Sequence, residues 1–294
     1  MIETIKIKGR MKVTLEVIPL NKHIGAEISG VDLRKPVSDE LRKELYALWM
    51  KHLVLLFRDQ ELTQQQLVDA TGNFGQLAKL VRKAEYRPSG YAQLLDNIML
   101  ISNIRENGVP IGALPDGEMH FHHDMLHQEI PHKGTCLYSV EVPSHGGNTC
   151  FANCYVAYDT LPDDLKQKLE GKRAFHSYNL GEQKRGDGKG SPQNNQATHP
   201  VFMRHDETGR KAIFVNRLMT EGVVGMDDSE SRPLLERVFD HSENPEWIYE
   251  HVWRPNDLLI WDNRCSMHAR TDFPEGERRL MLRTTIEGNT RPAA

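Results

Sequence analysis

The chain has 294 residues, of which 38% are hydrophobic and 27% charged, so it has enough apolar surface to offset the entropy of ordering and is not mainly disordered. Its 37 basic and 41 acidic residues leave a net charge of −4, which predicts no nucleic-acid partner and no membrane partner. No apolar run reaches the length of about 18 residues that a membrane helix needs. The N-terminus lacks the apolar core of a signal peptide. The four cysteines form no Cys-x-x-Cys pair. We therefore expect a cytoplasmic protein with free thiols.

The N-terminal region predicts two strands and a helix. Apolar and polar residues alternate with period 2 at 11–17, and a similar segment follows at 25–31. Ser38 is typical of a helix N-cap and precedes two acidic residues, which suit the first turn of a helix. The apolar face of this helix is made of Leu41, Leu45 and Leu48.

The central region continues with short elements. The apolar run 53–57 is too short for a helix and predicts a buried strand. Thr63 opens a capping-box pattern, and we expect its helix to end near Gly75. A further strand is predicted at 135–142, and one helix is predicted at 162–171, with a proline in its first turn and a glycine at its end.

The C-terminal region contains one long segment without apolar periodicity, 177–198. A structureless loop of this length inside a compact domain is typical of a lid or of a disordered linker, and we expect a lid. A helix fits 229–241, and strand-like runs at 257–261 and 279–285 close the chain. Many short strands with few helices predict one mainly β domain over residues 1–294, a barrel or sandwich with flanking helices.

Histidines are concentrated in one segment that begins His120-Phe121-His122-His123-Asp124. Residues two apart in a strand share a face, so His122 and Asp124 should point the same way, with His120 on that side and His123 opposite. Two such side chains are half of a metal site. The alternative for this segment alone is a polar loop with solvated histidines.

The same residues fit the start of another motif. His120-x-His122-x-Asp124 also begins the di-zinc motif of metallo-β-lactamase-fold hydrolases. That motif requires a histidine directly after the aspartate, whereas position 125 is a methionine. A metallo-hydrolase that uses the His120, His122 and Asp124 cluster is therefore a minor alternative.

Two segments near the C-terminus add candidates. A buried strand ends in Trp261-Asp262-Asn263-Arg264, and His268 follows. In the last predicted strand Arg279 and Arg283 share a face, and buried arginines are unfavourable unless anions meet them. Because a guanidinium binds carboxylates through two parallel hydrogen bonds, an anionic ligand is expected. Alternatively, both arginines lie on the surface and pair with Glu275, Glu277 or Glu287.

Taken together, His122, Asp124 and His268 form a set of two histidines and one carboxylate. Such a facial set leaves coordination positions open and is typical of non-haem Fe(II) oxygenases. The open positions would hold a bidentate cosubstrate and O2, and a nearby arginine would anchor the far end of an oxo-acid.

With these motifs in place, the chain resembles the taurine dioxygenase/phenoxyacetate-herbicide dioxygenase family of Fe(II)- and 2-oxoglutarate-dependent oxygenases. The resemblance extends from residue 20 to residue 288, and its elements recur in order. They are the opening at 25–33, His122-His123-Asp124, the Gly-Gly-x-Thr turn that ends at Thr149, the Trp-Asp-Asn-Arg run before His268, then Arg279 and Arg283.

The resemblance implies a double-stranded β-helix, or jelly roll, with flanking helices. It implies Fe(II) bound by the three-residue set, with 2-oxoglutarate as cosubstrate and O2 as oxidant. Thr149 and Arg279 would hold the distal carboxylate of 2-oxoglutarate. Arg283 would contact the metal-side carboxylate of the cosubstrate, the substrate anion, or both. The expected reaction hydroxylates a small molecule and releases succinate and CO2.

Departures from the family pattern bear on the substrate. Phe121 stands where a tryptophan is usual, and His123 where a threonine or serine is usual. Residues 76–90 contain no counterpart of the His-and-Tyr pair that the taurine enzyme uses on sulfonate. Basic side chains stand there instead, namely Lys79, Arg82, Lys83 and Arg87. We predict a small anionic organic acid, an aryloxyalkanoate or another carboxylate, with a sulfonate or an amino-acid-like substrate as the alternative.

Two further functions are less favoured. Halogenating relatives in this superfamily replace the carboxylate ligand with a small residue, whereas Asp124 is present here. A non-enzymatic jelly-roll binding module would be expected to have lost a ligand or an anchor, and none is missing. Assembly as a homo-oligomer is left open by the sequence.

Overall fold

The computed structural model describes residues 2–7, 13–79, 94–112, 119–178 and 196–294. The strands are β1 (Glu3–Ile7), β2 (Val13–Pro19), β3 (Ala26–Ser29), β4 (Val54–Phe57), β5 (Met99–Ser102), β6 (Arg105–Glu106), β7 (Val109–Pro110), β8 (Met119–His122), β9 (Gly134–Glu141), β10 (Thr149–Asn153), β11 (Arg173–Ser177), β12 (Gln196–Pro200), β13 (Phe202–Arg204), β14 (Lys211–Ile213), β15 (Thr220–Val223), β16 (Ile248–His251), β17 (Leu258–Asp262), β18 (Ser266–Arg270) and β19 (Leu280–Ile286). The helices are α1 (Asp39–His52), α2 (Gln64–Gly72), α3 (Cys154–Asp159), α4 (Asp163–Leu169), α5 (Asp228–Ser242) and the short 3-10 helix η4 (Pro245–Trp247).

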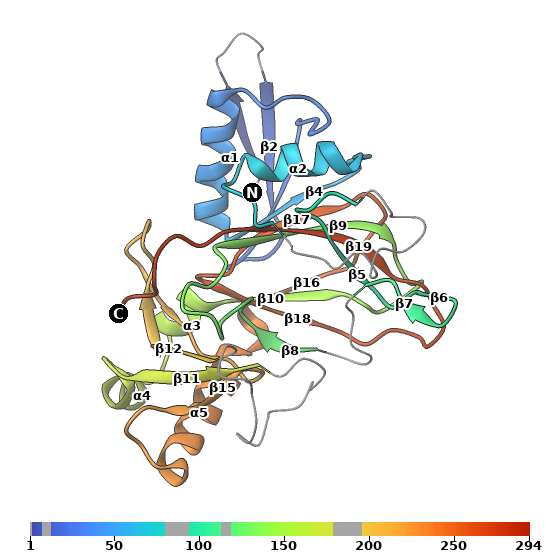
Figure 1. Cartoon of the computed structure of the whole chain (residues 1–294). Coiled ribbons are helices and arrows are strands. Elements are labelled where there is room, and N and C mark those ends of the chain that lie inside the picture. Colours follow the sequence, from blue (N-terminus) through green and yellow to red (C-terminus); the bar gives the residue numbers. More distant parts are fainter. Residues whose placement is uncertain (1, 8–12, 80–93, 113–118, 179–195) are drawn as a thin grey trace.

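Two sheets form the centre of the molecule. The larger has eight strands in the order β1-β2-β3-β4-β17-β9-β19-β5, and the smaller has four in the order β16-β10-β18-β8. Neighbouring strands are antiparallel except for β3 and β4, which pair in parallel. Figure 1 shows the small sheet lying against one face of the large sheet, with α1 and α2 on the side of the other face. This is the predicted jelly roll with flanking helices.

Alternation along the strands divides the side chains between two cores. On β17, Leu258 and Ile260 point outward to the cluster that contains the helices, whereas Leu259 and Trp261 point inward to the cluster between the sheets. α1 begins after the predicted cap, since the Ser38 hydroxyl accepts the backbone N–H of Leu41. The predicted apolar face of α1 is confirmed, because Leu41, Leu45 and Leu48 are all buried.

A third layer packs below the small sheet (Figure 1). It contains the sheet β12-β11-β15 together with α4 and α5, around a separate buried apolar cluster. β11 ends at Ser177 and pairs there with Gln196, the first residue of β12. The expectation that 177–198 is structureless throughout was therefore wrong at both ends, because those residues complete a strand pair. Residues 179–195 lie outside the described part of the chain, so the lid stays a prediction.

Smaller differences have local causes. α2 opens with the predicted capping box at Thr63 but ends at Gly72, because Asn73 already serves as its C-cap. The short helix α3 was not predicted, and its first turn is capped by the side chain of Asn153. The four cysteines are free, as predicted. Within the described residues, no helix combines the length and apolarity needed to cross a bilayer.

Candidate metal centre

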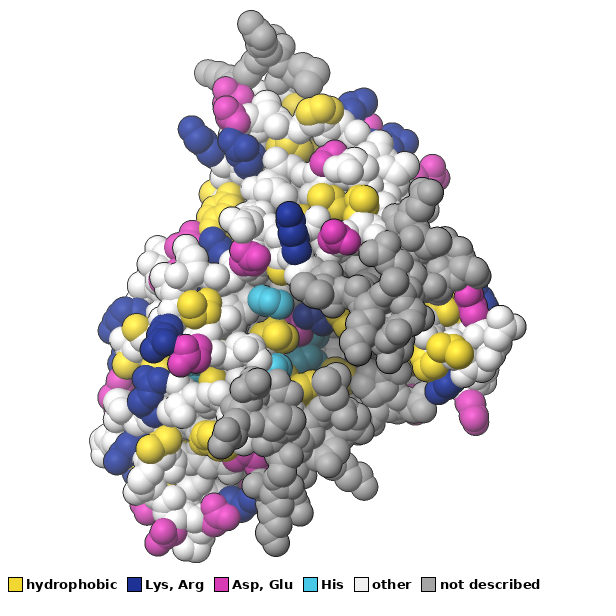
Figure 2. Space-filling model, in the orientation of Figure 1, with side chains coloured by type: hydrophobic (Ala, Val, Ile, Leu, Met, Phe, Trp, Pro, Cys, Tyr) yellow, Lys and Arg dark blue, Asp and Glu magenta, His cyan; other side chains and the backbone are white. Residues whose placement is uncertain are grey.

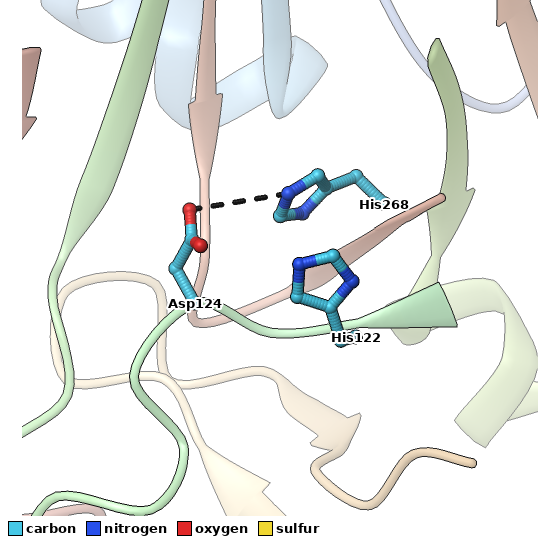
Figure 3. Close-up of side chains that lie close together, drawn as sticks. All are labelled: His122, Asp124 and His268. Atoms are coloured by element: carbon cyan, nitrogen blue, oxygen red, sulfur yellow. Dashed lines mark ion pairs between the residues drawn. The ribbon is translucent and has the colours of Figure 1, made fainter. Parts of the chain in front are cut away.

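The three predicted ligands come from two neighbouring strands and the turn that follows one of them. His122 ends β8 and lies opposite His268 of β18 in the antiparallel register. Asp124 follows after the strand has ended, and Met125 next to it has a positive φ of 60°. The chain thus turns directly after the carboxylate, which leaves Asp124 beside the two imidazoles (Figure 3).

The three side chains converge. Each offers one ligand atom, and these atoms lie within 4.8 Å of one another. The imidazole centroids are 4.1 Å apart, and Nε2 of His268 lies 4.0 Å from Oδ2 of Asp124 (Figure 3). Two nitrogens and one carboxylate oxygen are the donor set of the facial triad that non-haem iron sites use. His120 does not join the group, so the residues of the di-zinc alternative do not come together.

The protonation of the histidines suits metal binding. Nδ1 of His122 lies 2.9 Å from the carbonyl oxygen of His120, and a carbonyl only accepts, so Nδ1 carries the proton and Nε2 keeps its lone pair. Burial lowers the pKa of His122 and holds that of His268 well below the usual range, so both rings are neutral near pH 7. Burial alone would raise the pKa of Asp124, but Arg283 and the imidazoles outweigh it and hold the pKa below its usual range.

A second group of potential ligands, His205, Asp262 and Cys265, is already satisfied by protein partners. Nε2 of His205 donates to Asp262, and its Nδ1 accepts the backbone N–H groups of Glu207 and Thr208. Asp262 is also paired with Arg264. Both imidazole nitrogens are thus engaged, which identifies this group as a structural network.

Arg279 lies where a buried anion is needed. Its side chain is 1% exposed, and neither Nε nor Nη1 has a hydrogen-bond partner among the described residues. Burial, and then the positive charge of Arg270, lower its pKa to about 9. A Cβ on Gly147, whose φ is +63°, would lie 3.3 Å from Nε of Arg279. The absence of a side chain at Gly147 therefore leaves room for the guanidinium. The alternative that Arg279 pairs with surface glutamates is therefore wrong for this residue.

Thr149 is held in one hydrogen-bonding role. Its hydroxyl accepts the indole N–H of Trp253 at 3.0 Å, in a buried environment. An indole N–H can only donate, so the hydroxyl proton of Thr149 remains available for another acceptor. A carboxylate is such an acceptor.

Arg283 has a contact that the sequence did not predict. Its Nη2 lies 3.0 Å from Oδ1 of Asp124. This guanidinium therefore binds the predicted metal-ligand carboxylate directly. Arg278, the residue before the buried Arg279, does not point into this site and forms an exposed ion pair with Glu141.

Three aromatic or imidazole side chains lie near this pair. The rings of His127 and Tyr178 stack with centroids 5.4 Å apart. Nδ1 of His127 and Nδ1 of His132 are buried and have no hydrogen-bond partner among the described residues. Burial lowers the pKa of His132 to about 4, and the charge of Asp124, which raises this pKa, and that of Arg283, which lowers it, contribute less. Of the predicted basic run, only Lys79 belongs to the described residues.

Figure 2 shows a hollow on this face of the molecule, with histidine, acidic and basic side chains at its floor. Sequence reasoning missed three residues that act on the predicted site residues: Trp253 on Thr149, Thr135 on Asp124 and Arg270 on Arg279. Arg270 could have been found from its position two residues after His268, since both share a strand face. Thr135 and Trp253 carry no such local signal.

The match to known proteins covers nearly the whole chain. The model of the taurine catabolism dioxygenase TauD, TfdA family matches residues 16–285. The chain is 30% identical to the (S)-phenoxypropionate/alpha-ketoglutarate-dioxygenase of Sphingobium herbicidovorans, over 95% of this chain and 97% of that protein. It is 32% identical to the alpha-ketoglutarate-dependent 2,4-dichlorophenoxyacetate dioxygenase of Cupriavidus pinatubonensis, over 91% and 96% of the two chains.

Solved structures agree with this match. The crystal structure of a taurine dioxygenase from Burkholderia xenovorans superimposes with a TM-score of 0.78 at 28% identity, over 95% of this chain and 93% of that one. Alpha-ketoglutarate and 2-oxoglutarate are the same molecule, so the predicted cofactor chemistry, Fe(II) with 2-oxoglutarate and O2, is confirmed at the level of the family. The chain belongs to the TauD, TfdA family and is a 2-oxoglutarate-dependent dioxygenase.

Proposed function

We propose that this dioxygenase hydroxylates a small anionic organic acid, with Fe(II) bound by His122, Asp124 and His268. One observation carries the proposal: the buried guanidinium of Arg279 has no partner on Nε or Nη1 within the described part of the chain, and it lies immediately before β19, the strand that also presents Arg283 to Asp124. A dianionic cosubstrate that bridges the metal and Arg279 would satisfy both ends.

The three proposed ligands act together as the protein's share of the metal site. The two neutral imidazoles and the carboxylate would hold the ion, and a facial set of three protein ligands would leave coordination positions for the cosubstrate and O2. When bound, Fe(II) with 2-oxoglutarate and O2 supplies the oxidising power for hydroxylation, and the cosubstrate leaves as succinate and CO2. The contact between Nδ1 of His122 and the His120 carbonyl keeps Nε2 free for the ion.

Thr149 and Arg279 hold the distal carboxylate of 2-oxoglutarate in this proposal. Trp253 occupies one lone pair of the Thr149 hydroxyl, so the proton of that hydroxyl can be donated to a carboxylate oxygen. Nε and Nη1 of Arg279, to which no described residue is hydrogen-bonded, provide two further donors. Their burial strengthens each of these hydrogen bonds to an anion.

The substrate side is assigned to Arg283 and to the His127–Tyr178 pair. Arg283 brings positive charge to Asp124, and the Nδ1 atoms of His127 and His132, which bond to none of the residues that the structure describes, are available to a polar ligand. The stacked ring of Tyr178 offers an aromatic surface beside them. A positive charge next to aromatic rings suits an aryloxyalkanoate, and the relatives named for phenoxypropionate and 2,4-dichlorophenoxyacetate support this class.

A substrate panel tests the proposal. The purified protein with Fe(II) and 2-oxoglutarate is offered phenoxyacetate, 2-phenoxypropionate, taurine and an amino acid, and succinate is measured with and without each compound. We expect an aryloxyalkanoate or a related carboxylate to stimulate succinate formation and to be recovered as a hydroxylated or cleaved product. Stimulation by taurine alone would contradict the substrate class, and equal turnover by His122→Ala would contradict the metal site.

The single domain over 1–294 and the cytoplasmic location stay predictions from the sequence, which leaves the assembly state open.

A further inference from the structure

A chain of three buried hydrogen bonds lies behind the carboxylate of Asp124. The indole N–H of Trp261 donates to Oδ1 of Asn263 at 2.9 Å, and Nδ2 of Asn263 donates to the hydroxyl of Thr135 at 2.9 Å. The hydroxyl of Thr135 then donates to Oδ2 of Asp124 at 2.6 Å. All four residues are at most 5% exposed. They are therefore withheld from solvent and depend on one another for their hydrogen bonds.

The direction of this chain is fixed by its first member. An indole N–H only donates, so the carbonyl oxygen of Asn263 must face Trp261 and its amide nitrogen must face Thr135. The oxygen of Thr135 consequently accepts, and its single proton must point to Asp124. An ionised carboxylate accepts this proton in a short, charge-assisted hydrogen bond.

The backbone holds the chain in place. Thr135 of β9 and Trp261 of β17 are direct partners in the antiparallel register. The backbone N–H of Asn263 donates to the carbonyl of Lys133 at 3.0 Å, just before β9. The amide oxygen and the amide nitrogen of Asn263 are thus both hydrogen-bonded to residues of the large sheet. Asp124, in contrast, follows a strand of the small sheet.

The two oxygens of Asp124 have different partners. Oδ2 receives the Thr135 hydroxyl and is the oxygen 4.0 Å from Nε2 of His268. Oδ1 is paired with Arg283. Because each oxygen is held by a different partner, the carboxylate is hindered from rotating, and Oδ2 is the oxygen that lies against His268.

We infer that Thr135, oriented by Asn263, is a positioning residue that presents Asp124 to the metal through Oδ2 alone. This inference rests on the proposed function, in which Asp124 is a ligand. A carboxylate held in this way binds through one oxygen and does not take a second coordination position, which the cosubstrate and O2 require. Partners outside the ligand set commonly affect metal affinity about 10- to 100-fold.

The test compares two hydroxyl deletions in the same sheet. Thr135→Val removes the hydroxyl that reaches Asp124, and Thr135→Ser retains it. Thr284→Val is the matched control, since Thr284 of β19 is equally buried and its hydroxyl donates to Thr71 rather than toward the metal group. Affinity for Co(II) is measured by titration calorimetry on chelator-treated full-length protein, and stability by urea unfolding.

We expect Thr135→Val to weaken Co(II) binding by about 10- to 100-fold, while Thr135→Ser and Thr284→Val bind like the wild type. Because Asn263 acts through Thr135, Asn263→Ala should weaken binding in the same direction but less, and should add little to Thr135→Val. Asn263→Ala carries the test by itself if Thr135→Val does not fold.

Two results would overturn the inference while leaving the proposed function intact. These are wild-type Co(II) affinity in Thr135→Val, or an equal loss in Thr284→Val, which would mean that any buried hydroxyl of the sheet matters as much. If His122→Ala also binds Co(II) like the wild type, the proposed metal site itself fails and the positioning role fails with it.

Discussion

Replacing Arg279 with methionine should stabilise the metal-free protein and at the same time weaken its binding of 2-oxoglutarate. The protein alone lowers the pKa of this guanidinium from its usual 12.5 to about 9, chiefly by burial and then by the charge of Arg270. At about 1.4 kcal/mol per pKa unit, burial of the charged form is disfavoured by roughly 5 kcal/mol. Methionine is unbranched, replaces the aliphatic part of the arginine side chain and carries no charge.

Replacement of poorly compensated buried ions by apolar residues has raised stability by about 1–4 kcal/mol in other proteins. We therefore expect Arg279→Met to melt a few degrees above the wild type when no cosubstrate is present. The loss for 2-oxoglutarate should be large, because two charge-assisted hydrogen bonds of about 1.5–3 kcal/mol each are removed. That sum corresponds to roughly 100- to 10,000-fold weaker binding.

Thermal melting of chelator-treated protein, with and without 2-oxoglutarate and Co(II), measures both effects. Arg278→Met is the matched control, since Arg278 is the preceding residue and forms an exposed pair with Glu141. Exposed ion pairs contribute about 0–1 kcal/mol, so this control should melt like the wild type and keep its response to 2-oxoglutarate. If Arg279→Met melted below the wild type and still responded to 2-oxoglutarate, the assignment of Arg279 as a cosubstrate anchor would be refuted.

Three further predictions concern other groups of the site. His122→Ala and Asp124→Ala should abolish turnover and the visible absorption that Fe(II) and 2-oxoglutarate form without oxygen, and full activity in either would refute the ligand assignment. Trp253→Phe removes the N–H that orients Thr149, and the KM for 2-oxoglutarate should rise ~5-fold, as expected for about 1 kcal/mol; an unchanged KM would contradict that role. Burial lowers the pKa of His123 to about 3 and of His132 and His199 to about 4, below the unfolded value of 6.5, so below pH 6.5 the unfolded state binds more protons and stability falls with pH. Urea unfolding of the metal-free protein between pH 6 and 4.5 should approach a slope of about 4 kcal/mol per pH unit from these three groups, and a flat profile would show that these histidines are not buried neutral.

The elements with strong local signals were predictable from the sequence. The cap at Ser38 and the apolar face of α1 follow from capping and helix periodicity. Arg279 could be proposed as an anion anchor from its spacing after His268, whereas only the structure shows that it is buried. His122 and His268 could be proposed as ligands, although they are 146 positions apart, because each belongs to a recognisable motif. What brings them together is the pairing of β8 with β18, which no local pattern reveals.

The residues that the sequence did not predict all act across the fold. Thr135 is an ordinary strand threonine until β9 is placed opposite the turn that carries Asp124, and Trp253 has no visible role until its loop meets β10. The hydrogen-bond partner of a buried hydroxyl or indole cannot be read from sequence periodicity, because tertiary packing determines which residue lies next to it. The ion pair between Arg283 and Asp124 likewise joins two motifs that looked independent.

The site depends on how the two sheets are held against each other. The imidazoles of His122 and His268 belong to the small sheet, whereas Thr135 and Arg283, which hold the two oxygens of Asp124, belong to the large one. The geometry of the carboxylate therefore depends on the apolar cluster between the sheets, where Trp261 packs. Trp261 serves both parts, since its ring lies 4.8 Å from that of His268 and its N–H begins the hydrogen-bond chain to Asp124. Close packing of this cluster thus supports two of the three candidate ligands, His268 through ring contact and Asp124 through the hydrogen-bond chain.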